Sequence, residues 1–401
     1  MSETVDLSHG ATFAHGFPHE FFKKLRDEQP IYWHEPTQYS PGGEGFWVVS
    51  RYEDCVRVMR DPATFSSDKV PPRKGGGTSL FDEPYAGLAM NTADDPQHKR
   101  LRGLVSQGFT PRAITDMEAD LRRRAKLILE KIPNPEKCEF MSEVARELPL
   151  QAICTILGVP EEDRVQLSDW IDHGLMVQSE GVISREYLLL IQDYGKNLIE
   201  RKREKPANDI LSAIIHARTD DPSEALLTPL ELVNFFLLLF PAGAETTRSA
   251  IGGAMLAFIE NPDQLAKLRA HPELMPNAVE EIVRWTTPSI YKRRTATCDT
   301  EIAGGKVKAG EKLSYWEMSA NRDERMFKDP FRFDITRDPN PHVGFGTGIH
   351  ICLGIALARM EIKIMFEELL ARFNSFELLA PPLWMPNNRL HGVRELMLRA
   401  I

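Results

Sequence analysis

The sequence predicts a mainly α-helical protein with small β-sheets, organised around one long buried helix. Helical patterning dominates roughly residues 95–285 and returns at roughly 353–373. Strand-like segments punctuated by glycine and proline are confined to roughly residues 25–65 and 290–320, and a turn follows near the C-terminus. Because no linker rich in serine, glycine or proline separates these parts, we expect a single domain over residues 1–401.

The predicted strands are short. Residues 31–33 (Ile-Tyr-Trp) and 46–49 (Phe-Trp-Val-Val) are rich in aromatic and β-branched side chains, which favour strands. Residues 70–77 (Val-Pro-Pro-Arg-Lys-Gly-Gly-Gly) predict an irregular loop. Strand patterning returns over residues 300–318, where the pairs at 304–305 and 309–310 contain glycine and break it into short pieces.

The long central helix has clear start and stop signals. Thr228 is suited to cap its N-terminus, Pro229 to occupy the first helical position, and Glu231 to complete a capping box. The next stop signal is the Asn261-Pro262 pair, so the helix can hold about 30 residues, or about 45 Å at 1.5 Å per residue.

This helix is predicted to be buried in the protein. Residues 235–240 (Phe-Phe-Leu-Leu-Leu-Phe) are apolar on every side. A membrane span is the rival interpretation, but Glu245 and Arg248 interrupt the apolar run after fewer than about 18 residues. The first six residues carry two acids and no apolar run, which argues against a signal peptide or membrane anchor. We therefore expect a cytoplasmic protein.

The composition excludes several classes of function. There are 49 Lys and Arg against 58 Asp and Glu, so the net charge is −9 and the positive charge typical of nucleic-acid binders is missing. The five cysteines (Cys55, Cys138, Cys154, Cys298 and Cys352) are far apart and include no Cys-x-x-Cys pair. This pattern excludes a disulfide-dense scaffold and a zinc ribbon, and it suits a reducing compartment.

Cys352 lies in the sharpest local pattern, residues 345–354 (Phe-Gly-Thr-Gly-Ile-His-Ile-Cys-Leu-Gly). Glycines allow close backbone approach, and the N-terminus of the helix that follows favours a thiolate. Three interpretations compete: a nucleophile, half of a zinc site with His350, and an axial haem ligand. Ile351 stands where a nucleophile elbow has glycine, and no second ligand pair supports zinc. A haem needs only one thiolate. The other four cysteines we interpret as small buried side chains.

The order Phe-x-x-Gly-x-His-x-Cys-x-Gly resembles the haem-binding loop of the cytochrome P450 family. The resemblance spans roughly residues 15–395 and implies the P450 fold, with the long buried helix over the haem. It implies that Cys352 is the thiolate ligand to the iron of haem b. The loop residues implied to bind the cofactor are Phe345, Gly346, Gly348, His350, Cys352 and Gly354.

Five segments are similar to a mycobacterial or actinobacterial branch of the family. They are residues 17–19, 32–34, 45–47, 245–248 and 321–323. That branch includes oxidisers of sterols and branched lipids. Ala244 departs from the Asn or Asp that several of those lipid oxidisers carry, which argues against assuming a sterol substrate.

Glu245 and Thr246 lie in the central helix, within residues 242–247 (Ala-Gly-Ala-Glu-Thr-Thr). A buried acid is costly unless it is paired or functional. The pair resembles the family's catalytic acid and alcohol, which implies that Thr246 hydrogen-bonds dioxygen and that Glu245 helps relay protons. The alternative is that the Thr246 hydroxyl only bonds to a helical carbonyl. Pro241 lacks an N–H and is expected to kink the helix just before Gly243.

Four basic residues are implied to bind the two haem propionates. His98 and Arg102 are at i and i+4 on one helical face, Arg294 precedes strands, and His350 lies in the cysteine loop. Arginine suits this task because its planar fork binds a carboxylate through two hydrogen bonds.

Glu281 and Arg284 are at i and i+3 and can pair on one helix face. In this position before the cysteine loop they resemble the family's structural Glu-x-x-Arg motif. Their implied task is to lock the segment that carries Cys352. Arg332 and Arg337 are both candidates for a third partner.

A further set of mostly apolar residues is implied to line the substrate site. They are Leu88, Met90, Leu175, Met176, Val177, Phe240, Ala244, Thr247, residues 288–291 including Ile290, and Leu390. For each, a place in the hydrophobic core is the competing interpretation.

The resemblance implies a haem-thiolate monooxygenase that inserts one atom of dioxygen into a C–H bond of a hydrophobic small molecule, such as a lipid, steroid or terpenoid. Electrons are expected from NAD(P)H through a ferredoxin reductase and a ferredoxin. The rival enzyme is a hydroperoxide-using relative, which does not need Glu245 and Thr246. The rival of another class is a non-catalytic haem or lipid sensor.

An acidic ferredoxin is expected to dock on a locally basic face near Cys352. The candidate contributors are Arg100, Arg122, Arg123, Arg124 and Arg359, although a solvated helix face also explains the three consecutive arginines. We expect a monomer without a nucleic-acid partner.

Overall fold

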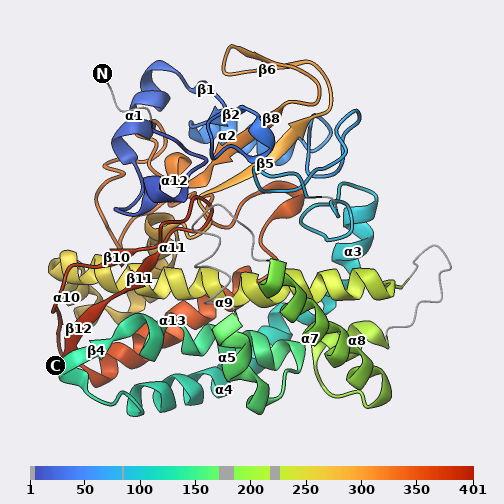
Figure 1. The fold of residues 1–401 in the computed structure, drawn as a ribbon. Helices are drawn as coiled ribbons and strands as arrows, with labels where there is room; N and C mark the ends of the chain where they lie inside the picture. The colour runs from blue at the N-terminus through green and yellow to red at the C-terminus, as the bar shows by residue number, and fades with distance from the viewer. Residues whose placement is uncertain (1–4, 84, 171–184, 217–225) are drawn as a thin grey trace.

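A computed structural model describes residues 5–83, 85–170, 185–216 and 226–401. In Figure 1 a strand-rich part that begins at the N-terminus lies above a larger helical part, and helix α9 crosses the molecule between them. The predicted mainly α-helical fold with small sheets is confirmed. The helices are α1 His19–Glu28, α2 Tyr52–Arg60, α3 Gln97–Ser106, α4 Pro111–Glu130, α5 Glu147–Leu157, α7 Arg185–Glu204, α8 Ile210–Ile215, α9 Pro229–Glu260, α10 Pro262–Ala270, α11 Met275–Thr286, α12 Glu317–Ala320 and α13 Ile355–Arg372.

The strands within residues 31–66 and 291–316 lie in the two predicted strand regions, whereas those at 138–139 and within 376–400 were not predicted. They are β1 Ile31–His34, β2 Phe46–Val49, β3 Phe65–Ser66, β4 Cys138–Glu139, β5 Tyr291–Ala296, β6 Thr300–Ile302, β7 Gly305–Val307, β8 Lys312–Trp316, β9 Phe376–Leu378, β10 Leu383–Trp384, β11 Val393–Glu395 and β12 Met397–Ala400. Residues 70–77 form neither helix nor strand, as predicted, and α12 begins at Glu317, inside the segment predicted as strand.

The main sheet joins distant parts of the chain. Its order is β1-β2-β8-β5-β3, with β2 parallel to β8 and the other pairs antiparallel. In the β5–β8 pair, Lys292 lies opposite Tyr315 and Arg294 lies opposite Leu313. Because side chains alternate along a strand, Lys292 and Arg294 share one face of β5, and Arg293 lies on the other. This sheet therefore fixes the side on which Arg294 is presented.

Helix α9 starts with the predicted capping box. The Thr228 side chain accepts from the Glu231 backbone N–H, and the Glu231 side chain accepts from the Thr228 backbone N–H. The helix holds 32 residues and ends at the cap Asn261. It continues through Pro241 as one helix.

Most of α9 is buried by the helices that surround it, chiefly α5, α7, α11 and α13. Its middle has a gap in this cover, because Ala242 is exposed and Leu238 and Thr246 are only partly buried. These three residues are spaced by four and lie on one face, so α9 has an uncovered stripe at its centre. Among the described residues, no helix is long and apolar enough to span a membrane.

Candidate active site

The segment around Cys352 is a tight loop that ends at the N-terminus of α13. The Cys352 N–H donates to the Phe345 carbonyl (2.9 Å), and the Gly346 N–H donates to the Val343 carbonyl (2.8 Å). Burial raises the pKa of the Cys352 thiol, while the Gly354 N–H and nearby positive charges lower it. The position of a Cβ on Gly354 is open, so the backbone here can approach another group closely.

Helix α2 supports this loop from the strand-rich part. Gly348 has a φ of 75°, and a Cβ there would lie 2.5 Å from the Met59 carbonyl oxygen, so only glycine fits. Beside it, Arg60 Nε donates to Thr347 Oγ1 (3.2 Å). The first residues of the cysteine loop are thus held against the end of α2.

The four predicted propionate ligands converge beside the cysteine loop, and we call them the basic cradle: His98, Arg102, Arg294 and His350. The rings of His98 and His350 are 4.6 Å apart. Burial, together with the charges of Arg294, His98 and Arg102, lowers the pKa of His350 to about 2. Burial also lowers the pKa of Arg102. The cradle therefore brings the charges of Arg102 and Arg294 together with two histidines, of which His350 is neutral at pH 7.

The chemistry of the cradle fits a haem with its two carboxylates. His98 Nδ1 lies 3.1 Å from Asp95 Oδ1, but its buried Nε2 has no hydrogen-bond partner among the described residues. Arg294 Nη1 donates to the backbone carbonyl of Arg293 (2.8 Å), and its guanidinium lies over the Tyr315 ring, 5.3 Å from the ring centre. An anion beside these groups relieves their mutual repulsion and accepts their hydrogen bonds.

Thr246 lies on the uncovered stripe of α9, and its hydroxyl donates to the Ala242 carbonyl (2.7 Å). This is the helix bond named as the alternative to a catalytic role. A hydroxyl that donates in this way still has lone pairs that accept a hydrogen bond. Glu245 is buried and pairs with Arg248, with Oε2 and Nη1 3.2 Å apart.

Glu361 is a buried carboxyl that the sequence did not single out. It lies on α13, and burial raises its pKa to about 8. A hydrogen bond from Thr247 acts in the opposite direction but does not offset the effect of burial. Thr247, predicted to line the substrate site, is buried and lies against Glu361. Only a contact between α9 and α13 in the folded chain reveals this pair.

Glu281 and Arg284 are fully buried and form a two-bond ion pair, with distances of 2.7 and 2.8 Å. Arg337 Nε lies 3.1 Å from Glu281 Oε2 and is the third partner that the sequence left open. Arg332 contributes its backbone carbonyl, which accepts from Arg284 and Arg337. We call Glu281, Arg284 and Arg337 the Glu281 network. It fixes the chain that leads into the cysteine loop.

A second ion-pair group joins α11 to the cysteine loop. Arg359 binds Glu280 through two hydrogen bonds of 2.7 Å, and His342 Nε2 lies 3.1 Å from the same carboxylate. Burial opposes ionisation, but these two partners lower the pKa of Glu280 to about 2. The Arg359 guanidinium also lies over the Phe345 ring, 5.2 Å from its centre. Phe345 is thereby held at the start of the loop.

The predicted substrate residues have different surroundings. Leu88 and Met90 border an apolar recess between α3 and α9. Phe240 is fully buried and stacks on Phe236, and Ile290 is fully buried in the strand-rich core, which favours the core interpretation for both. Ala244 is buried in α9, and residue 289 bridges to Leu390. Leu175, Met176 and Val177 lie outside the described residues.

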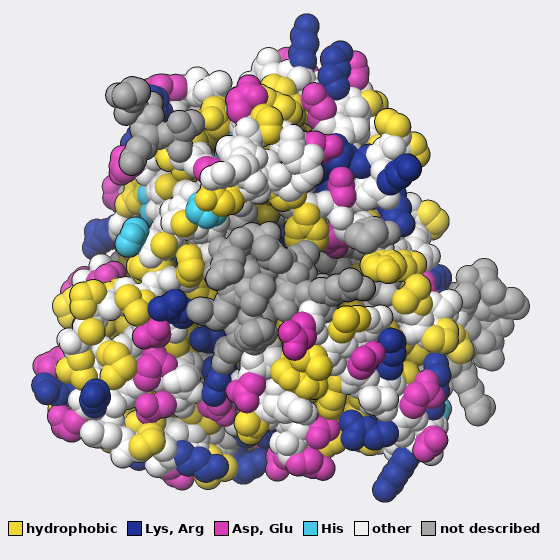
Figure 2. All heavy atoms as spheres, viewed as in Figure 1, with side chains coloured by type: hydrophobic (Ala, Val, Ile, Leu, Met, Phe, Trp, Pro, Cys, Tyr) yellow, Lys and Arg dark blue, Asp and Glu magenta, His cyan; other side chains and the backbone are white. Residues whose placement is uncertain are grey.

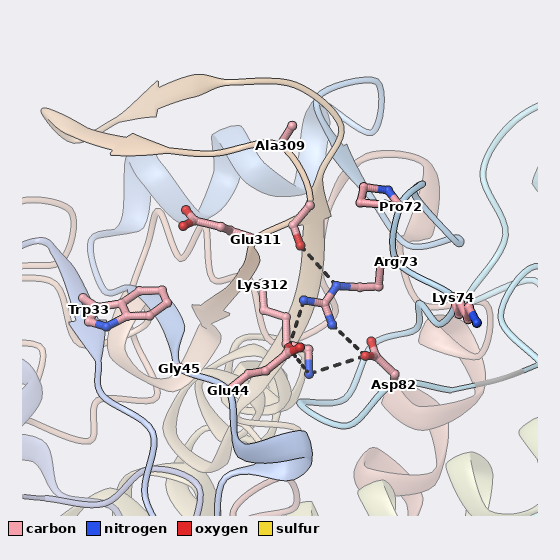
Figure 3. A pocket seen from close by; sticks show the side chains of 11 residues that line it. Trp33, Glu44, Gly45, Pro72, Arg73, Lys74, Asp82, Ala309, Glu311 and Lys312 are labelled. Atoms are coloured by element: carbon pink, nitrogen blue, oxygen red, sulfur yellow. Dashed lines mark hydrogen bonds and ion pairs between the residues drawn. The ribbon is translucent and has the colours of Figure 1, made fainter.

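The loop that carries Leu88 and Met90 is anchored on the sheet at a hollow of about 600 Å³ (Figure 3). Arg73 bridges Glu44 (2.9 Å) and Asp82 (2.6 Å), and Lys312 of β8 also pairs with Glu44 (3.2 Å). Four of the charges that line the hollow, those of Glu44, Arg73, Asp82 and Lys312, are paired with one another. Its role in the site is therefore to fix the start of this loop.

Each cation predicted to dock a ferredoxin has a carboxylate partner. Arg100 pairs with Glu231, Arg122 with Glu118, Glu367 and Glu368, Arg123 and Arg124 with Asp120, and Arg359 with Glu280. Positive and negative side chains are interspersed over the face shown in Figure 2. Their charges are thus locally compensated, which the sequence prediction did not anticipate.

The remaining cysteines fit the sequence interpretation except at one position. Cys55, Cys138 and Cys154 are buried, and Cys298 is exposed rather than buried. The described residues contain no group of three or more His, Cys, Asp or Glu that could hold a metal ion. Nothing in the described part of the chain thus favours the zinc interpretation of Cys352 and His350.

Comparison with known proteins identifies the class of this site as that of haem-thiolate oxygenases. The chain belongs to the cytochrome P450 family and is a monooxygenase that uses haem and dioxygen. The cytochrome P450 family model matches residues 269–393. "Putative cytochrome P450 126" of Mycobacterium tuberculosis is 48% identical over 98% of this chain and 96% of its own length. The predicted actinobacterial branch is confirmed.

Two further relatives are named for their activities. The "Methyl-branched lipid omega-hydroxylase" of Mycobacterium tuberculosis is 38% identical over 94% of this chain and 89% of its own length. The "Steroid C26-monooxygenase" of Rhodococcus jostii is 36% identical over 98% of this chain and 84% of its own length. Among solved structures, Mycobacterium marinum cytochrome P450 CYP268A2 in complex with pseudoionone has a TM-score of 0.88 and 33% identity, and covers 99% of this chain and 98% of its own.

Proposed function

We propose that this protein hydroxylates a hydrophobic small molecule of the lipid, steroid or terpenoid class, with electrons from NAD(P)H through a ferredoxin reductase and a ferredoxin. The observation that carries the proposal is the convergence of the basic cradle beside the loop of Cys352. Haem held by a cysteine thiolate supplies the activation of dioxygen and the insertion of one oxygen atom into a C–H bond.

The residues of this chain have distinct roles in that reaction. Cys352 would bind the iron, and the Gly354 N–H stabilises its thiolate by a hydrogen bond. His98, Arg102, Arg294 and His350 would bind the two carboxylates of the haem.

Helix α9 would supply the groups for proton transfer. The Thr246 oxygen lies on the uncovered stripe and accepts a hydrogen bond while its proton is held at the Ala242 carbonyl. Glu245, held by Arg248, is the adjacent carboxylate that passes protons inward. The uncovered stripe is otherwise apolar, which supports a hydrophobic substrate. The activities of the two relatives named above, on a branched lipid and on a steroid, support the same class of substrate.

The electron donor is proposed to dock over α2 and the cysteine loop. Arg60 is exposed there and touches Thr347, five residues before Cys352. The rate of reduction by an acidic ferredoxin should fall with added salt and in Arg60→Glu. Reduction that is indifferent to both changes contradicts this docking face.

The test of the haem-thiolate centre is spectroscopic. Reduced wild-type protein with carbon monoxide should give the red-shifted Soret band of a thiolate-ligated haem, and Cys352→Ala should lose it. Cys138→Ala, at another buried cysteine, is the matched control and should keep the band. An unshifted band in the wild type refutes the proposal.

The role of Thr246 is tested by measuring how much product is formed for each NAD(P)H consumed. Thr246→Ala should bind haem and substrate as the wild type does, but divert most electrons from NAD(P)H into hydrogen peroxide, because the hydrogen bond that directs protons is lost. Thr247→Ala, one residue along the helix and facing Glu361, is the control. Equal product per NAD(P)H in wild type and Thr246→Ala removes Thr246 from the catalytic groups.

A further inference from the structure

An ion pair between a partly exposed lysine and a buried glutamate lies next to the basic cradle and has no part in the function described so far. Lys292 Nζ bonds to Glu317 Oε2, joining β5 to the first turn of α12. Lys292 shares a face of β5 with Arg294. Arg293, on the other face, instead donates to the Gly76 carbonyl (2.7 Å) and lies 2.9 Å from Asp82. Lys292 therefore points to the same side as the cradle.

Glu317 places the pair against the cysteine loop. Its side chain is 1% exposed, and Oε1 lies 3.9 Å from the position of a Cβ on Gly346. Burial raises the pKa of Glu317, and the charges of Lys292 and Arg294 oppose that rise. A buried carboxylate needs a cation close by, so Glu317 holds the Lys292 ammonium in place.

The pair thus touches two parts of the proposed haem site. Lys292 lies on the face of β5 that presents Arg294, and Glu317 lies against Gly346 of the cysteine loop.

We propose that the Lys292–Glu317 ion pair controls the reduction potential of the haem, with Lys292 as a positioning residue that adds a fifth basic group to the cradle. The inference rests on the proposed haem-thiolate centre. Reduction of the ferric iron adds one electron and no positive charge, so a nearby cation favours the ferrous form and a nearby anion disfavours it. The two members of the pair therefore act with opposite signs.

Four variants separate these signs. Lys292→Met should lower the ferrous-to-ferric ratio at a fixed electrode potential by about tenfold, which corresponds to about 59 mV for one electron. Glu317→Gln should raise the ratio by a similar factor. The double variant should return close to the wild type, and Lys292→Arg, which keeps the charge, should not depart from it. Lys306→Met, at an exposed lysine of β7, is the control for a distant charge.

The measurement is a spectroelectrochemical titration of the substrate-free holoprotein. Shifts of the same sign in Lys292→Met and Glu317→Gln, or shifts no larger than that of Lys306→Met, overturn the inference. If Lys292→Met does not retain haem, Glu317→Gln and Lys292→Arg decide the question, because both keep a cation at position 292. A wild type without the thiolate Soret band refutes the proposed function itself, whereas a wild type with that band and unmoved variants refutes only this inference.

Discussion

The molecule contains two buried clusters of basic side chains that are satisfied in different ways. In the Glu281 network, Arg284 and Arg337 share the carboxylate of Glu281, and backbone carbonyls take the remaining donors. In the basic cradle, burial and the charges of Arg294 and Arg102 lower the pKa of His350, and His98 Nε2 has no partner among the described residues. The first cluster is complete within the chain, whereas the second is complementary to a ligand with two carboxylates. The first serves stability and the second serves binding.

The largest expected effect lies in the Glu281 network. Glu281→Gln leaves Arg284 as a buried cation without its carboxylate, and should lower the free energy of unfolding by about 3–5 kcal/mol. The measurement is denaturant unfolding. Glu118→Gln, which removes a partly exposed partner of Arg122, is the control and should cost less than about 1 kcal/mol. Similar losses in both variants contradict the distinction between a buried network and a surface one.

Glu361 adds a third case, a buried acid that is neutralised by a proton. Its pKa of about 8 in the folded protein is above the ordinary value of 4.5, so the folded state keeps a proton that the unfolded chain loses. Wild-type stability should therefore fall between about pH 4.5 and 8, by up to about 1.4 kcal/mol per pH unit.

Glu361→Gln lacks this titration, so it should match the wild type near pH 5 and become the more stable protein as the pH rises to 8. Melting temperatures over that range measure the difference. A constant difference between the two proteins across the range would show that Glu361 is ionised in the folded state.

The smallest expected change in stability lies in the cradle. Arg102→Leu removes one repelling cation, so the haem-free protein should be as stable as the wild type or more stable. Transfer of haem to an acceptor protein should nevertheless be about 10- to 100-fold faster, because a charge-assisted hydrogen bond to a carboxylate is lost. Lys99→Leu, at an exposed position of the same helix, should leave that rate unchanged. If the Arg102→Leu protein unfolds more easily but keeps its haem, the basic cradle serves stability and not binding, which contradicts the assignment made above.

Sequence reasoning identified features that are encoded locally. The capping box of Thr228 and Glu231 sets the start of α9, and the glycines around Cys352 mark the loop, because each depends on residues close together in the chain. It did not separate Arg332 from Arg337, since both lie in irregular chain and only the fold decides which side chain reaches Glu281.

Features that depend on packing between distant elements were missed. Lys292 and Glu317 are 25 residues apart and meet only because β5 pairs with β8 ahead of α12. The raised pKa of Glu361 depends on how α13 packs against α9. The prediction of docking arginines did not take into account that acids on other helices, such as Glu280 and Glu367, compensate the charges of these arginines.

The contact between α2 and the cysteine loop also bears on the order in which the protein matures. Arg60 and Thr347 are 287 positions apart, and Gly348 fits directly against the Met59 carbonyl. During synthesis, α2 leaves the ribosome long before the loop that it supports. The loop can take its final shape only when the chain through residue 354 has been made and has returned to this early helix. We therefore expect the cofactor to be loaded late, after this contact has formed.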